Sequence, residues 1–240
     1  MPVMRWGAVI VAAGRGSRMN AGENKVFLPL AGRPMLAWTL EAFERCAVVE
    51  MVVIAAAENE IGKAEALVRA HGFAKVRKVV PGGAERQDSV LAGLTALETE
   101  GVLVHDAARP LITPELIVAC ARAAEEHGAA VPAVPVKDTV KVTENGMVVS
   151  TPERSRLVAV QTPQAFRRLE LLEAHLAARK EGVQATDDAM LLERLGKKVA
   201  CVPGDDTNLK ITTPEDLLVA ELFARRRRGM PDHDADRPGV

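Results

Sequence analysis

Short apolar stretches alternate with amphipathic stretches along most of this 240-residue chain. The apolar stretches have the length of strands and predict strands at 8–11, 48–55, 75–80, 102–105, 129–134 and 199–202. The amphipathic stretches predict helices at 34–45, 58–71, 88–97, 114–127, 169–180, 187–195 and 214–226. Strands that alternate with helices of this length favour an α/β fold, in which helices cover both faces of a mostly parallel sheet.

The alternation is interrupted between residues 136 and 160. Two short stretches of alternating polarity flank Asn145-Gly146 there, which predicts a β-hairpin. An isolated hairpin is marginally stable in water, so its apolar side must pack on its own domain or on a second subunit. We favour the second subunit, because the insertion follows an otherwise complete alternation. Residues 1–228 are then expected to form a single domain with this arm, and the polar residues 229–240 a disordered tail.

The first predicted strand ends in a loop suited to phosphates. Gly14 and Gly16 let a ligand approach the main chain closely, while Arg15, Arg18 and Lys25 surround the loop with positive charge. Exposed amides and converging cations predict a polyphosphate site. A tight turn that carries ordinary surface basic residues is the alternative.

Two well-known phosphate loops do not fit this segment. The dinucleotide-binding motif requires a third glycine where this chain has Met19, and the P-loop requires Gly-Lys-Ser/Thr, which is absent. The loop is therefore of another kind, with cations supplied outside the glycine turn.

Three further loops follow predicted strands, where ligands of such sheets bind. Residues 81–89 contain paired glycines that could bind a base edge, with Asp88 or Ser89 capping the next helix. In 105–110, Asp106 could bind Mg²⁺ or the acceptor and Arg109 a phosphate, unless the two form only a structural ion pair. His105 is expected to pack or orient rather than act as a base. Lys210 could add a fourth cation to the first loop, or be an ordinary surface lysine.

Composition argues against several classes of partner. A net charge of −1 favours neither nucleic acid nor a membrane surface, and 3% aromatic residues with no Tyr leave few stacking platforms. We find no apolar segment near the roughly 20 residues of a membrane helix. Cys46, Cys120 and Cys201 lack metal or redox spacing and are expected to be reduced core thiols of a cytoplasmic protein.

Taken together, these loops resemble those of the 2-C-methyl-D-erythritol 4-phosphate cytidylyltransferase family of the non-mevalonate isoprenoid pathway. The matching stretches are 12–19 with Lys25, 82–86, 89–90, 105–110, 161–164, 186–189 and 208–212. The first loop alone marks only nucleotidyltransferases in general, whereas the combination is far more specific. One departure is Val26, where the family commonly has Gln.

The resemblance implies a Rossmann-like nucleotidyltransferase domain, a homodimer that exchanges β-arms, and the use of CTP and Mg²⁺. It implies in-line transfer of CMP from CTP to methylerythritol phosphate with release of pyrophosphate, a reaction that needs no strong base because a phosphate oxygen is already ionised. Mg²⁺ would be held mainly by the CTP phosphates, with Asp106 as a possible ligand.

The same resemblance implies roles for individual residues. Lys25 and Lys210 would hold the α-phosphate and Arg18 the other CTP phosphates, and these three are the catalytic candidates together with Asp106. The nucleotide-binding residues would be Ala12, Ala13, Gly14, Gly16, Gly83 and Ser89. The polyol phosphate would be bound by Asp106, Arg109, Thr139, Arg154, Thr162 and Thr186, partly across the dimer.

Three other functions stay open at this point. A ribitol-5-phosphate cytidylyltransferase would use the same chemistry on another polyol. A non-catalytic nucleotide-binding module would bind CTP without releasing pyrophosphate, although the presence of Lys25, Asp106 and Lys210 together argues against it. A dinucleotide oxidoreductase is disfavoured by Met19.

Overall fold

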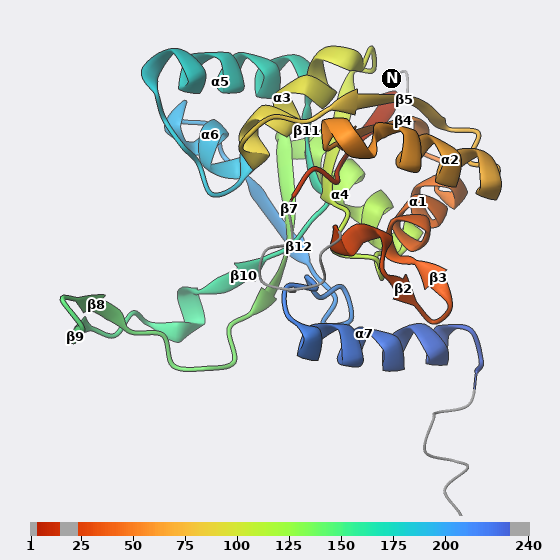
Figure 1. The fold of residues 1–240 in the computed structure, drawn as a ribbon. Coiled ribbons are helices and arrows are strands. Elements are labelled where there is room, and N and C mark those ends of the chain that lie inside the picture. The colour runs from red at the N-terminus through yellow and green to blue at the C-terminus, as the bar shows by residue number, and fades with distance from the viewer. Residues whose placement is uncertain (1–3, 15–23, 231–240) are drawn as a thin grey trace, which may run out of the picture.

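One large sheet forms the centre of the molecule (Figure 1). The computed structural model describes residues 4–14 and 24–230. Within these residues the sheet has eight strands: β1 (Trp6–Val11), β4 (Val49–Ala56), β5 (Val76–Pro81), β6 (Gly101–Asp106), β7 (Ala129–Pro135), β10 (Val158–Val160), β11 (Gln164–Arg167) and β12 (Ala200–Pro203). Their order is β10-β7-β11-β6-β1-β4-β5, with β12 beside β7. β1 pairs in parallel with both β4 and β6, so the predicted parallel core is confirmed.

Helices cover both faces of this sheet, as predicted. The helices on the two faces are α1 (Met35–Arg45), α2 (Ile61–His71), α3 (Arg86–Ala96), α4 (Pro114–His127), α5 (Arg168–Glu181) and α6 (Asp188–Arg194). A seventh described helix, α7 (Pro214–Arg227), belongs to neither face. Successive side chains of β1 point to opposite faces: Ile10 packs in the cluster that contains residues of α1, α2 and α4, and Val9 in the cluster that contains residues of α3, α5 and α6. Such two-sided burial is why the strands are almost continuously apolar.

A third, smaller cluster joins the two ends of the chain. Ala220 and Ala224 of α7 pack with Leu30 and Trp38, close to the short pair β2 (Pro29–Leu30) and β3 (Arg33–Pro34). Thr213 caps α7 as its sequence predicts, since its side chain accepts a hydrogen bond from Asp216 N. The segment that carries Lys210 is therefore held against the segment that follows Lys25.

The predicted hairpin is present and stands away from the sheet (Figure 1). It comprises β8 (Val142–Glu144) and β9 (Met147–Ser150), which pair with each other. Asn145 and Gly146 have φ angles of 50° and 80°, the left-handed values of a tight hairpin turn. Every residue of both strands is exposed, including Met147 at 72% and Val148 at 59%. The alternative in which the arm packs on its own domain is therefore wrong for the described residues.

Several local predictions need correction. Antiparallel β11, which lies between β6 and β7, and β10 were not predicted. α3 begins earlier than expected, and its N-cap is Glu85 rather than Asp88 or Ser89. Asp88 instead accepts a hydrogen bond from Glu85 N, which forms one half of a capping box. Cys201 is exposed, whereas the other two cysteines are buried. β12 is paired only with β7, so it is less enclosed than the central strands.

No helix within residues 4–14 and 24–230 is long and apolar enough to span a membrane. Of the expected tail, residues 231–240 lie outside the described residues.

Candidate functional site

Three of the predicted loops lie at the carboxyl ends of the parallel strands β6, β1 and β5, with β4 between the last two. Ala12 follows β1, Gly82 follows β5, and Asp106 is the last residue of β6. This end of an open α/β sheet is where ligands bind.

The first two loops are in direct contact. A Cβ atom on Gly82 would lie 2.5 Å from Ala13 Cβ and 2.7 Å from Ser89 Oγ, so only glycine fits there without a shift of the neighbouring atoms. Gly83 N donates to Ser89 Oγ at 3.1 Å. Ala12 O accepts from Asn24 Nδ2 at 2.8 Å, which ties the end of β1 to the turn that carries Lys25. The structure thus brings Ala12, Ala13, Gly83 and Ser89 to one edge.

Asp106 is buried and held between two cations. Its Oδ1 accepts from Arg86 Nε at 3.0 Å, and its Oδ2 lies 2.8 Å from Lys210 Nζ. Burial alone would raise the pKa of this carboxyl, but the charges of Arg86 and Lys210 outweigh burial and hold its pKa well below the usual range. Asp106 is therefore an anion at any physiological pH.

Arg109 does not form the ion pair that the sequence left open. Its Nη1 donates to Asn208 O at 2.8 Å and its Nη2 to Val160 O at 3.5 Å. Burial lowers the pKa of this guanidinium, but an arginine so far from its titration range keeps its charge. Because backbone carbonyls hold it in place, the positive charge of Arg109 can serve an anionic ligand.

His105 and Thr162 fix the backbone on either side of Asp106. Asp106 N donates to Thr162 Oγ1 at 3.1 Å, and the same hydroxyl lies 3.0 Å from His105 Nδ1. His105 Nε2 lies 3.1 Å from Arg109 O. Burial lowers the pKa of His105 to about 4, so the imidazole is neutral at pH 7. A neutral ring that donates a hydrogen bond from Nε2 to Arg109 O accepts one from the Thr162 hydroxyl at Nδ1. The predicted orienting role of His105 agrees with this geometry.

Lys25 and Lys210 come together although 184 residues separate them in the sequence. Lys25 Nζ donates to Ile211 O at 2.7 Å, directly beside Lys210 in the chain. Ile211 N in turn donates to Ala108 O, so the Lys210 segment is joined to the loop of Asp106 and Arg109. Lys210 is more than an ordinary surface lysine, because its ammonium group pairs with a buried carboxylate.

The other predicted site residues lie in different parts of the protein, and two of them lie outside the described residues. Thr186 lies just before Asp187, the N-cap of α6, and is exposed. Thr139 and Arg154 lie in the exposed arm, where Arg154 Nη1 donates to Lys137 O. Gly14 is described, with nothing within 4 Å of the position a Cβ would take. Gly16 and Arg18 lie outside the described residues, as does Arg15.

Sequence reasoning gave no role to Arg86 or to its second partner. Arg86 Nη1 donates to Asp188 Oδ2 at 2.7 Å, and Asp188 Oδ1 lies 2.9 Å from His175 Nε2. The partners are 20 and 102 residues from Arg86 in the sequence, so no local spacing could reveal them.

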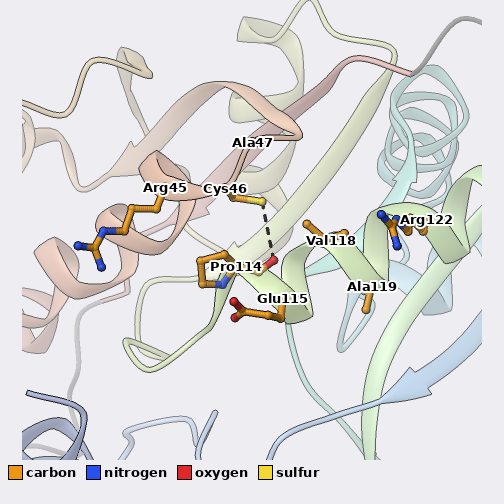
Figure 2. A pocket seen from close by; sticks show the side chains of 8 residues that line it. All are labelled: Arg45, Cys46, Ala47, Pro114, Glu115, Val118, Ala119 and Arg122. Atoms are coloured by element: carbon orange, nitrogen blue, oxygen red, sulfur yellow. Dashed lines mark hydrogen bonds between the residues drawn. The ribbon is translucent and has the colours of Figure 1, made fainter.

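A surface pocket of about 390 Å³ lies elsewhere, between the end of α1 and the start of α4 (Figure 2). Cys46, Glu115 and Arg122 line it, and Cys46 Sγ points toward Pro114 O. None of the residues placed at the strand ends lines this pocket, so it is not the candidate site.

Known proteins match this chain over nearly its whole length. The family model described as "IspD: 2-C-methyl-D-erythritol 4-phosphate cytidylyltransferase" matches residues 7–226. The protein of that name from Bacillus cytotoxicus is 49% identical over 221 residues, which cover 92% of this chain and 98% of that protein. The one from Geobacter metallireducens is 49% identical over 226 residues, 92% of this chain and 97% of that protein.

Solved structures agree with the sequence comparison. The crystal structure of 2-C-methyl-D-erythritol 4-phosphate cytidylyltransferase from Thermus thermophilus has a TM-score of 0.75 at 40% identity and covers 90% of this chain and 98% of that one. The 4-diphosphocytidyl-2C-methyl-D-erythritol synthase from Anaerococcus prevotii has a TM-score of 0.83 at 31% identity, covering 93% and 97%. The predicted Rossmann-like α/β fold is confirmed. This chain belongs to the 2-C-methyl-D-erythritol 4-phosphate cytidylyltransferase family of nucleotidyltransferases.

Proposed function

We propose that this enzyme transfers the CMP group of CTP to 2-C-methyl-D-erythritol 4-phosphate. An oxygen of the polyol phosphate attacks the α-phosphorus of CTP in line, a P–O bond forms, and the bond to the β-phosphate breaks to release pyrophosphate. The products are 4-diphosphocytidyl-2-C-methyl-D-erythritol and pyrophosphate. The family membership supports this substrate over ribitol 5-phosphate and favours catalysis over mere nucleotide binding.

The observation that carries the proposal is the convergence of Lys25 and Lys210 at the end of the sheet. The Lys25 ammonium binds the carbonyl next to Lys210, beside the Asp106 loop. Two anions must approach each other in this reaction, so neutralising and positioning charge matters more than moving protons. We assign both lysines to the α-phosphate and Arg18 to the remaining CTP phosphates. Lys210 then exchanges its contact with Asp106 for one with the nucleotide.

The contact between the first two loops supports the assignment of cytosine to that edge. Ala12, Ala13, Gly83 and Ser89 present mainly backbone groups there, with the close approach at Gly82 fixing their spacing. Backbone amides and carbonyls are rigid hydrogen-bonding groups that can recognise the edge of a base. Gly14 and Gly16 would leave room for the phosphates.

The second substrate would lie against Asp106 and Arg109. Arg109 offers a fixed positive charge to its phosphate, and Asp106, an anion at pH 7, can accept hydrogen bonds from its hydroxyls. Thr162 holds Asp106 by its backbone, and Thr186 stands at the start of α6. No group has to act as a strong base, which suits a site whose histidine is neutral and fully hydrogen-bonded.

Mg²⁺ fits this donor set as a metal held mostly by substrate. In the part of the chain that the structure describes, no group of three or more Asp, Glu, His or Cys side chains is arranged so that it could hold a metal ion. Mg²⁺ commonly binds one or two carboxylates together with substrate phosphates and water. Asp106 would be its protein ligand beside the CTP phosphates. When bound, the ion would neutralise charge on the triphosphate and the leaving pyrophosphate.

The exposed arm is the basis for proposing a homodimer. Val148 and Met147 project on a hairpin that the described part of its own chain leaves uncovered. We assign this surface to a second copy, with Thr139 and Arg154 of each arm completing the partner's polyol phosphate site. A water-soluble substrate pair and reduced thiols favour the cytoplasm as the location of such an enzyme.

A pyrophosphate-release assay tests the proposed reaction. The enzyme is given Mg²⁺ with CTP and methylerythritol phosphate, and separately with ribitol 5-phosphate or with ATP, GTP or UTP. Rapid release only with the first pair is expected. Faster release with ribitol phosphate, or CTP binding with no release, would contradict the proposal.

Removing either lysine should mainly affect turnover. Lys25→Ala and Lys210→Ala are each expected to lower kcat by about 10²-fold or more, the usual loss for one preorganised charge donor. Lys75→Ala is a matched control, because its Nζ also donates to a backbone carbonyl, Cys46 O, at 2.7 Å. Near-normal kcat in a folded Lys25→Ala or Lys210→Ala protein would refute that lysine's role.

A further inference from the structure

A chain of alternating charges runs inward from Lys210 and ends in the interior of the protein. Lys210 contacts Asp106, Asp106 contacts Arg86, Arg86 contacts Asp188, and Asp188 contacts His175. The outer end is the more exposed one: the side chain of Lys210 is 42% exposed, whereas those of Asp188 and His175 at the inner end are 1% and 0% exposed. Arg86 is the link between its outer and inner halves.

The shape of the guanidinium suits this position. Arg86 Nε binds Asp106 at 3.0 Å, while Nη1 binds Asp188 at 2.7 Å. A planar fork can hold two carboxylates at a fixed separation, whereas a lysine ammonium presents one point of charge. Burial alone would lower the pKa of Arg86, but the two carboxylates outweigh burial and raise its pKa, so the charge is permanent.

The inner carboxylate is itself firmly held. Asp188 Oδ1 lies 2.9 Å from His175 Nε2, and Asp188 N donates to Gln164 Oε1 at 3.1 Å. Asp188 is the first residue of α6, two residues after Thr186. Arg86 therefore connects the end of β6 with the first turn of α6.

This connection matters because Lys210 has two possible anions to neutralise. In the proposed reaction its ammonium binds the α-phosphate of CTP, and Asp106 then loses one of its two cations. Arg86 remains on the other oxygen. A buried carboxylate without a cation would be energetically costly and poorly oriented. The permanent contact with Arg86 therefore keeps Asp106 charged and in position for the second substrate.

We propose that Arg86 is a positioning residue for the second substrate: its two-pronged contact fixes Asp106 relative to the start of α6, so that both walls of the polyol phosphate site keep their spacing when Lys210 turns to the nucleotide. The inference rests on the proposed function. It assigns Arg86 no contact with substrate.

The main test compares Arg86→Gln with the wild type in steady-state kinetics. The variant is expected to lower kcat/KM for methylerythritol phosphate by about 10- to 100-fold, the typical loss when a supporting residue or a small displacement disturbs a site. The Kd for CTP, measured by calorimetry without Mg²⁺ so that the proposed Mg²⁺ contact of Asp106 does not contribute, is expected to stay within about threefold of the wild-type value. Arg86→Lys should lower kcat/KM less than Arg86→Gln does, because lysine keeps the positive charge although it lacks the planar, two-pronged guanidinium.

Arg225→Gln is the matched control. The side chain of Arg225 is 19% exposed, compared with 27% for Arg86, and it pairs with Glu221 of the same helix, α7, rather than with Asp106 or Asp188. A purely structural Arg86 would resemble this control: a lower Tm with unchanged kcat and KM for the polyol phosphate. That result would overturn the proposal, as would an equal loss of CTP affinity in Arg86→Gln.

A readout independent of activity separates this inference from the proposed function. The charged groups that face Asp106 are Arg86 from α3, Lys210 from the C-terminal segment and Arg109 from its own loop, beside neutral His105. In a crystal structure of Arg86→Gln the Asp106 carboxylate should lose its contact with residue 86 and shift relative to Asp188, whereas Arg225→Gln should leave both carboxylates in place. If the wild type transfers no CMP, the proposed function fails, while this comparison still decides whether Arg86 controls Asp106.

A second variant covers the case in which Arg86→Gln does not fold. Asp188→Asn leaves Arg86 on Asp106 but weakens its anchor on α6. It is expected to lower kcat/KM for the polyol phosphate by about tenfold with CTP affinity retained. Wild-type kinetics in both Asp188→Asn and Arg86→Lys would overturn the proposal.

Discussion

Asp106 illustrates how burial and charge act together on one residue. Its side chain is 10% exposed, yet Arg86 and Lys210 keep it ionised. The neighbouring His105 lacks a carboxylate partner on its ring, and burial therefore keeps it neutral. One strand end thus carries an anion that can bind hydroxyls and a neutral ring that holds the backbone.

The lowered pKa of His105 predicts a pH dependence of stability. The unfolded chain binds a proton at this residue below about pH 6.5, and the folded chain only below about pH 4. Between these values the free energy of unfolding falls as pH falls, by about 1.4 kcal/mol per unit. At pH 5 the loss from this residue alone is about 2 kcal/mol relative to pH 7.

Urea unfolding at pH 7 and pH 5 measures this effect. The drop between the two pH values is expected to be about 2 kcal/mol smaller in His105→Gln than in the wild type. His127→Gln serves as the control for loss of an imidazole, because the side chain of His127 is 50% exposed. Equal drops in the wild type and His105→Gln would contradict a neutral, buried His105.

Gly82 offers a second test at the scale of one residue. In Gly82→Ala the new methyl group would meet Ala13 Cβ at 2.5 Å and Ser89 Oγ at 2.7 Å, so the two loops must move apart. Overpacking of this kind costs about 1–3 kcal/mol, and CTP affinity is expected to fall by about tenfold. Gly62→Ala is the control, since nothing lies within 4 Å of its Cβ position. Unchanged affinity in Gly82→Ala would argue against cytosine at this edge.

Among the elements, the arm makes the most specific prediction. If Arg154 acts in the partner's site, a dimer of one Lys25→Ala chain and one Arg154→Ala chain keeps one intact site. A random mixture of the two inactive variants should then recover about a quarter of wild-type activity, because half of the dimers are hybrids. Mixing Lys25→Ala with Lys210→Ala should recover none, since both act within one chain. No recovery in verified Lys25/Arg154 hybrids would contradict a shared site.

The elements also show where sequence patterns are informative and where they are not. Buried strands such as β1, β4 and β6 were predicted because burial on both faces requires continuous apolar residues. β11 was missed because its four residues begin with Gln164, whose buried amide anchors α6 rather than following an apolar pattern. The Asn145-Gly146 turn was predicted because its backbone angles restrict the residue types that fit.

The same reasoning explains the partial prediction of the site. Loops at strand ends could be placed from the order of elements alone, and the structure confirms that those of Ala13, Gly82 and Asp106 lie at the carboxyl ends of β1, β5 and β6. Ion pairs between distant segments could not be placed: Asp106 pairs with Arg86 and Lys210 rather than with nearby Arg109. Such partners depend on packing in three dimensions, which local spacing does not encode.

At the scale of the whole molecule, the fold brings distant parts of the chain to one place. α7 packs on the segment that follows Lys25, and Ile211 is bonded both to Lys25 and to the Asp106–Arg109 loop. The C-terminal segment thus completes a site begun by the first strand. The proposed reaction depends on this convergence of Lys25 and Lys210, because each lysine alone would be one more surface cation.

A crystal structure of the enzyme with CTP and Mg²⁺ would show whether the two lysines converge on one phosphate. Lys25 Nζ and Lys210 Nζ are both expected to lie within about 3 Å of α-phosphate oxygens, with Lys210 released from Asp106 and Arg86 still bound to Asp106. A bound CTP whose α-phosphate contacts neither lysine, with Lys210 still on Asp106, would contradict this convergence.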